Sequence, residues 1–146
     1  MSLLYLLDSN ILSEPMRPQP NPDVIAMLDE HGDAIAMSSI SWHEMLFGVE
    51  RMSIGKRRTR IEDYLLNLLG PSLPILPYDE RAAAWHASER ARLVGQGLHS
   101  SFADGQIASI AATNSLILVT RNIKDFKNYS GLLIENWFEP STDESE

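Results

Sequence analysis

The stretch LLYLLDSN, residues 3–10, decides the fold, because a short apolar run ends there directly at a carboxylate. Residues 3–7 contain no charged side chain, as expected for a strand that is buried on both faces of a parallel sheet. Asp8 follows the run at once. In open α/β sheets, ligands bind in the crevice at the carboxyl ends of the strands. We therefore predict that Asp8 lies at a strand end facing such a crevice.

Strand-like and helix-like segments alternate along the rest of the chain. Further strands are predicted at residues 34–38, 73–76, 116–119 and 132–134, and helices at 9–16, 21–31, 41–52, 56–69, 80–94 and 101–114. Gly70-Pro71 is expected to end the helix before it, and a short turn or helix is expected at 124–126. This order predicts an α/β fold, a three-layer α/β/α sandwich with a central parallel sheet of four to five strands.

Length and composition favour one domain. We place it at residues 1–140, followed by an acidic tail, residues 141–146, that we expect to be mobile. The absence of cysteine excludes disulfides and thiolate zinc sites. No apolar run reaches the roughly 18 residues of a membrane span, and residue 1 leads directly into the first strand rather than into a basic leader. The expected location is the cytoplasm, with no membrane contact.

The charge balance limits how the chain could bind nucleic acid. Twelve basic and twenty acidic side chains give a net charge of −8, whereas proteins that hold nucleic acid by bulk charge are usually basic. Local cations would have to supply phosphate contacts, and the candidates are Arg17, Arg121 and the cluster of Lys56, Arg57, Arg58 and Arg60. A solvated helix face explains that cluster equally simply. A negative domain also suits a basic protein partner.

Three carboxylates are placed where such a sheet would gather them. Asp8 ends the first strand, Glu44 follows the strand at 34–38, and Asp104 opens the helix at 101–114. Carboxylate oxygens are the ligands of hard cations such as Mg²⁺. A divalent ion held in this way activates water and offsets charge in phosphodiester hydrolysis. Ser9, next to the first acid, is expected to hydrogen-bond a carboxylate or a metal-bound water.

Helix capping is the competing explanation for two of these acids. Ser41 with Glu44, and Ser101 with Asp104, both fit the Ser/Thr-x-x-acid capping box. The same pattern occurs at Thr59 and Glu62, where no strand precedes it, so the pattern alone does not indicate catalysis. Capping explains less at Asp8, and the three acids together favour a shared site.

Two other residue types invite functional interpretations. The four histidines show no paired ligand spacing, so we expect them at the surface or facing a partner rather than on a metal. Gly105 lies in a first helical turn, where it could admit the close approach of a substrate.

Four motifs in order carry a family resemblance. They are LLDSN (residues 6–10), S-x-x-E-x-x-x-G (41–48), A-D-x-x-I-A (103–108) and T-R-N-x-x-D-F (120–126). The set resembles the PIN-domain nucleases, most closely their VapC toxin branch. Residues 13–20, SEPMRPQP, are similar to the FitB-like subgroup. The resemblance covers about residues 3–137.

The resemblance implies a PIN-like nuclease domain that uses Mg²⁺ or Mn²⁺ to cut RNA endonucleolytically, as the toxin of a type II toxin–antitoxin pair. It further implies a homodimer or larger assembly and an antitoxin whose C-terminal segment bears an arginine that could enter the acidic site.

Position by position, Asp8, Glu44 and Asp104 match the family's metal-binding and catalytic acids. Many members have a fourth acid where this chain has Asn122, so either Asp125 takes that role or Asn122 acts as a neutral ligand. Candidate supporting or substrate-contacting residues are Ser9, Asn10, Thr120, Arg121 and Asn122.

A second class of function remains open. A catalytically weakened PIN-like binding module, controlled by a partner protein, is supported by Asn122 alone. A phosphatase of the haloacid dehalogenase type would also begin with a strand that ends in Asp, but it needs a second Asp where this chain has Asn10.

Overall fold

The computed structural model describes residues 2–139, which form a five-stranded parallel sheet in the order β3-β2-β1-β4-β5. The strands are β1 (Tyr5–Leu7), β2 (Ile35–Ser38), β3 (Ile75–Leu76), β4 (Ile117–Val119) and β5 (Ile134–Glu135). Leu7 at the end of β1 pairs with Met37 on one side and Val119 on the other. The predicted sheet is confirmed, although several strands are shorter than expected. The tail at 141–146 lies outside the described residues.

The strand order places β1 at the centre and splits the chain around it. From β1 the chain builds outward through β2 to β3, then returns to add β4 and β5 on the opposite side. The crevice for ligands in such sheets lies where the order reverses, outside the carboxyl ends of the strands. Here that point lies between β1 and β4.

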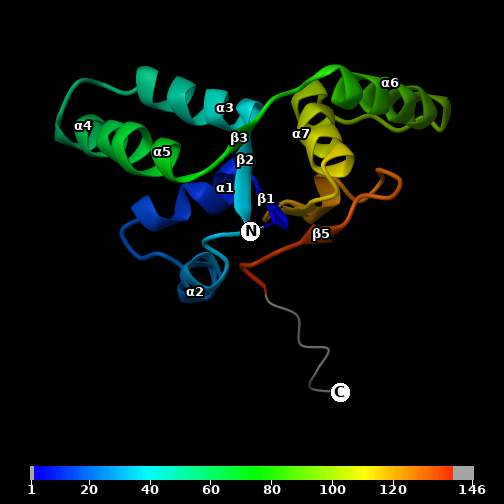
Figure 1. Ribbon diagram of the computed structural model, residues 1–146. Helices are drawn as coiled ribbons and strands as arrows, with labels where there is room; N and C mark the ends of the chain where they lie inside the picture. The colour runs from blue at the N-terminus through cyan, green and yellow to red at the C-terminus, as the bar shows by residue number, and fades with distance from the viewer. Residues whose placement is uncertain (1, 140–146) are drawn as a thin grey trace.

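The helices cover both faces of the sheet. They are α1 (Ser9–Leu12), η1 (Glu14–Met16), α2 (Pro22–Glu30), α3 (Ser39–Glu50), α4 (Lys56–Asp63), η2 (Tyr64–Leu69), α5 (Gly70–Ser72), α6 (Glu80–Gly95), α7 (Phe102–Thr113) and η3 (Ile123–Asp125). Figure 1 shows α3 to α5 grouped on one side and α6 with α7 on the other. No helix within the described part of the chain is both long and apolar enough to cross a bilayer.

Two hydrophobic cores make the three layers. Leu7 and Met37 point to one face, where they pack with Met45 of α3 and Leu65 of η2. The strand residues that directly precede them in sequence point to the other face. There Leu6, Ala36 and Leu118 pack with Ala82 of α6 and Ile107 of α7. Adjacent strand residues alternate between faces, so each short strand supplies both cores. The predicted three-layer sandwich is confirmed.

The helix expected at residues 9–16 is two pieces. The α-helix ends at Leu12, and a 3₁₀ turn follows from Glu14 to Met16. Pro15 has no N–H, so it cannot make the bond to the carbonyl of Ile11 that would continue the α-helix. The single-helix prediction was therefore wrong at this proline.

The helix expected to end at Gly70-Pro71 instead continues to Ser72. It widens into the π-helical turn η2 and re-forms as α5, and the backbone becomes extended only at Leu73. A wide turn carries the chain past Pro71 without the i→i−4 bond that proline cannot make. A Cβ on Gly70 would lie 3.0 Å from the ring of Trp42, so glycine here lets that ring pack against the helix.

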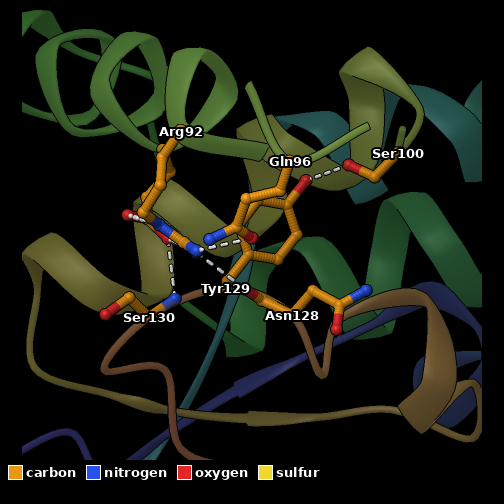
Figure 2. A network of polar contacts seen from close by, with 7 residues as sticks. Arg92, Gln96, Ser100, Asn128, Tyr129 and Ser130 are labelled. Atoms are coloured by element: carbon orange, nitrogen blue, oxygen red, sulfur yellow. Dashed lines mark hydrogen bonds and ion pairs between the residues drawn. The ribbon is translucent and has the colours of Figure 1, made fainter. Parts of the chain in front are cut away.

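A polar network ties the end of α6 to the loop after η3. The Glu89 carboxylate accepts two bonds from Arg92, at 2.7 and 3.0 Å, and one from the backbone N–H of Ser130, at 2.7 Å. Arg92 also donates to the carbonyl of Asn128 at 2.7 Å. Figure 2 shows this network, with the hydroxyls of Tyr129 and Ser100 in contact beside it. The network fixes the segment that directly follows Asp125.

We expect Glu89→Gln to lower stability at neutral pH and to lose this effect in acid. The hydrogen bonds from Arg92 lower the pKa of Glu89 below its usual range, and the bond from Ser130 adds to this. A carboxyl with a lowered folded-state pKa stabilises the fold above its unfolded pKa, about 4.3, and loses that contribution as pH falls through the folded value. The difference in the free energy of unfolding between wild type and Glu89→Gln should therefore shrink as the pH falls below about 4.3.

Urea denaturation between pH 3 and 8 measures that difference. Glu80→Gln is the matched control, because Glu80 lies on the same helix, is exposed, and has no ion pair among residues 2–139. If the difference in the free energy of unfolding between wild type and Glu89→Gln stays constant across this range, the charge-based explanation is contradicted.

Candidate functional site

Asp8 lies at the point where the strand order reverses. It is 7% exposed and caps α1, with Oδ1 accepting the N–H of Ser9 at 2.8 Å. Oδ2 accepts the hydroxyl of Thr120 at 2.8 Å, so the residues that follow β1 and β4 are joined directly. Asn10 reaches the same oxygen at 3.4 Å. The carboxylate is thus fixed in orientation by its neighbours.

The supporting residues predicted around Asp8 form one continuous chain. Thr120 is fully buried, and its hydroxyl oxygen accepts the N–H of Asn122 at 3.1 Å. The side-chain oxygen of Asn10 accepts the N–H of Arg121 at 3.1 Å. The Arg121 guanidinium lies 4.4 Å from the ring centre of Phe138, so part of its predicted phosphate-binding capacity is used within the protein.

Glu44 lies in the second turn of α3 rather than at its start. The N-cap is Ser38, whose hydroxyl accepts the N–H of Ser41 at 3.0 Å, so the capping box predicted for Ser41 and Glu44 is wrong. Strand β2 runs into α3 without a loop, and Ser38 is both its last residue and the cap. Glu44 therefore has no capping role, and its exposed side chain extends from the helix beside the sheet end.

Asp104 lies in the first turn of α7, as predicted, but the cap is Ser101. The Ser101 hydroxyl accepts the N–H of Asp104 at 3.0 Å. The side chain that satisfies the helix end is therefore that of Ser101, while the Asp104 carboxylate remains available to the site. The third pattern, at Thr59, is not a cap either, because that hydroxyl donates to the carbonyl of Gly55.

The acids raise one another's pKa, which places them in one electrostatic site. Burial raises the pKa of Asp8, hydrogen bonds from Thr120 and Ser9 oppose this, and the charge of Asp125 adds to the rise. Although the Glu44 side chain is exposed, partial desolvation by the surrounding protein raises its pKa, and the charges of Asp8 and Asp104 raise it further.

The same holds at Asp104. Burial raises the pKa of Asp104, a hydrogen bond with Ser101 opposes this, and the charges of Asp125 and Asp8 raise it further. Asp125 thus acts on both Asp8 and Asp104 from the turn η3. Crowded carboxylates of this kind favour a cation or a proton between them.

The four acids have the right ligand chemistry for a hard cation, but they are spread apart. Every one of these side chains offers carboxylate oxygen, which Mg²⁺ and Mn²⁺ prefer. Within residues 2–139, however, no three His, Asp or Glu side chains are grouped closely enough to hold one ion together. The side chains of Glu44 and Asp125 are exposed and so have room to change rotamer.

Ser41, expected from the sequence only as a helix cap, lies beside Asp8. Its hydroxyl is buried and, among the described residues, has no partner at hydrogen-bonding distance. It nevertheless lies near enough to Asp8 to lower that carboxyl's pKa. The hydroxyl thus remains available to support Asp8.

Two cavities flank the acids. One of about 520 Å³ borders Ser9 and Glu44, and another of about 330 Å³ borders Asp104 and Asp125. The second is polar, lined by residues such as His99, Ser100 and Asn128.

Comparison with known families matches the PIN domain to residues 5–132 of this chain. The chain belongs to the PIN-domain family. Toxin FitB of Neisseria gonorrhoeae is 38% identical over 128 residues, which is 84% of this chain and 91% of FitB. VapC ribonuclease Y4jK of Sinorhizobium fredii is 32% identical, covering 94% of this chain and all of that protein.

Solved structures give the same family. FitAcB from Neisseria gonorrhoeae superposes on this PIN domain with a TM-score of 0.87 at 34% identity, covering 94% of this chain and 100% of that one. FitAB bound to a DNA fragment superposes at 0.88 and 33% identity, covering 94% and 98%. The expected resemblance to VapC and FitB-like proteins is thus confirmed, and relatives in this PIN family are named toxins and ribonucleases.

Proposed function

We propose that this PIN domain is a metal-dependent endoribonuclease, the toxin of a type II toxin–antitoxin pair, acting in the cytoplasm. The main support is the placement of four acids from separate elements around the strand reversal, three of them with a pKa raised in part by neighbouring acids. Relatives that match nearly the whole chain are named ribonucleases. The proposal covers a single nuclease domain over residues 1–140.

Asp8, Glu44, Asp104 and Asp125 would hold the Mg²⁺ or Mn²⁺ ion. Such an ion, when bound, lowers the pKa of water and offsets the negative charge that develops on phosphate oxygens. Thr120 and Ser9 fix the Asp8 carboxylate through their hydrogen bonds. Asn10 and Asn122 extend that support to the loop after β4. Fixed ligands reduce the reorganisation needed during the reaction.

A protein partner is part of the proposal. The acidic site would accept an arginine from the C-terminal segment of an antitoxin, because a guanidinium pairs with two carboxylate oxygens at once. An arginine placed there would compete with the cation and stop cleavage. We further propose that the toxin forms a homodimer or larger assembly.

The test is incubation of the purified protein with total RNA in Mg²⁺, Mn²⁺ or EDTA. We expect cleavage with either ion and none in EDTA. Undiminished cleavage in EDTA would refute the metal mechanism. Intact RNA under every condition would favour the binding-module alternative.

We expect Asp125, rather than Asn122, to supply the fourth ligand. The charge of Asp125 reaches both Asp8 and Asp104, whereas Asn122 contributes no charge. Asp125→Asn should weaken apparent Mn²⁺ affinity, and the control Asn122→Asp should leave it equal or make it tighter. The measurement is the rise in melting temperature across a Mn²⁺ titration. If the melting temperature of Asp125→Asn responds to Mn²⁺ as that of wild type does, Asp125 is a turn residue and not a ligand.

A further inference from the structure

The cavity beside Glu44 combines an apolar lining with a cationic opening. It lies among α1, η1, α3 and the α4–η2 helix, and its volume of about 520 Å³ is in the range of small-ligand sites, roughly 300–1,000 Å³. Met45, Met52, Ile61 and Tyr64 line it. The hydroxyl of Tyr64 donates to the carbonyl of Leu12 at 2.8 Å, which fixes that ring against α1.

Three arginines border the same cavity. Arg57 and Arg60, one turn apart on α4, are exposed and form no ion pair within residues 2–139. Arg17 faces them from the end of η1, and its only acidic neighbour in the described chain is Glu14 at 3.7 Å. The protein has a net charge of −8, but the opening of this cavity is locally positive.

Arg58 differs from its two neighbours on α4 in how its charge is used. It lies between Arg57 and Arg60 in sequence, yet it does not line the cavity. Its guanidinium is held by Glu50 at 3.2 Å, Glu62 at 3.5 Å and the carbonyl of Met52 at 3.0 Å. Helix α4 therefore uses one arginine for its own structure and directs the two others to the cavity.

We infer that this cavity is a nucleotide subsite of the proposed ribonuclease. It would take the base of a nucleotide next to the scissile phosphate, with Arg17, Arg57 and Arg60 on the flanking phosphates. The inference rests on the proposed function.

Two physical features favour RNA as the occupant. A phosphodiester brought to four carboxylates is repelled unless cations hold it alongside, and the three arginines line the same cavity that Glu44 borders. Arginine binds phosphate oxygens in pairs, and an apolar, aromatic lining receives a base without regard to its hydrogen bonds. The subsite should therefore contribute affinity more than sequence preference.

The first test removes charge at matched positions on one helix. Binding of a fluorescein-labelled, single-stranded RNA 12-mer is measured in Mg²⁺ at several salt concentrations, using Asp104→Asn protein so that the RNA stays intact. Arg57→Gln and Arg60→Gln should each weaken binding and reduce the slope of log K against log salt by about 0.7. Arg58→Gln, which removes the same charge from the same helix, should leave the slope unchanged.

The second test fills the cavity without crowding the core. Gly48 lines the cavity, and a Cβ added there meets no atom within 4 Å. Gly48→Leu should melt at the same or a higher temperature, because glycine is unfavourable inside a helix. RNA binding should weaken while the salt slope stays the same. Gly95→Leu, also uncrowded but away from the cavity, is the control.

The outcomes separate the two levels of inference. If wild-type protein cleaves no RNA in Mg²⁺ or Mn²⁺ and the Asp104→Asn parent binds none at any salt concentration, the proposed function fails, and the subsite fails with it. If the parent binds RNA and all variants bind equally well, the subsite alone is refuted. In that case, weaker association of Gly48→Leu with a co-expressed partner protein would assign the cavity to a protein segment.

Discussion

Asp104→Asn is expected to abolish metal-dependent RNA cleavage while leaving the fold intact. The sequence allowed two roles for this residue, helix cap or metal ligand. The structure assigns the capping bond to Ser101, whose hydroxyl accepts the N–H of Asp104 at 3.0 Å. Asparagine keeps the shape of the side chain and removes its charge. Loss of turnover without loss of folding would therefore identify Asp104 as a ligand.

Thermal melting completes this test. In EDTA, Asp104→Asn should melt at the same or a higher temperature, because burial and the charges of Asp125 and Asp8 disfavour the ionised carboxylate. The rise that wild type gains from Mn²⁺ should shrink, since a ligand of the folded state stabilises it by RT ln(1 + [L]/Kd).

Ser101→Ala is the matched control for the cap. It should cost roughly 0.5–2 kcal/mol of stability and remain active well below its melting temperature. An active Asp104→Asn protein with an undiminished Mn²⁺ shift would overturn the ligand assignment.

Gly105→Ala should be among the most destabilising single-methyl changes in the protein. A Cβ at this position would lie 2.1 Å from Nε2 and 2.6 Å from Cδ2 of His86, far inside van der Waals contact. The ring cannot easily withdraw, because it is buried, its Nδ1 is 2.9 Å from the hydroxyl of Tyr78, and it packs against Phe102. Overpacking of this kind costs about 1–3 kcal/mol. Chemical denaturation measures the loss.

Gly48→Ala is the control, because it makes the same change inside a helix where no atom lies within 4 Å. It should gain about 0.5–1 kcal/mol. A double-mutant cycle with His86→Ala tests the cause: the combined loss should be smaller than the sum of the two single losses. Equal stabilities for Gly105→Ala and Gly48→Ala would refute the proposed clash.

The sheet and the approximate position of the acids could be predicted from local sequence. Apolar runs such as residues 3–7 identify buried strands by composition, and an acid directly after one lies at the strand end whatever the rest of the chain does. The start of α3 was harder to predict from the sequence. Ser38 and Ser41 both have the chemistry of a cap, and only the absence of a loop between β2 and α3 decides for Ser38.

Contacts between distant segments account for the errors at Gly105 and His86. Gly105 was interpreted as room for a substrate and His86 as a surface residue, yet each explains the other: the glycine makes room for a buried ring from α6. Helical spacing places His86 on the same face of α6 as Ala82 and Leu93, but α6 alone does not show that a ring has room there. The run of small residues around Gly105 in α7 was the available signal, since such residues allow close approach of a neighbouring element.

The hydrogen bond between Asp8 and Thr120 joins residues 112 positions apart. Strand β1 is synthesised well before its neighbour β4 and the turn with Asp125 that follows β4. Contacts of this sequence separation form late in folding. A growing chain that has not reached β4 has neither Thr120 nor Asp125, and its central strand still has an open edge. The complete set of acids therefore comes together only after the segment with Asp125 has been synthesised.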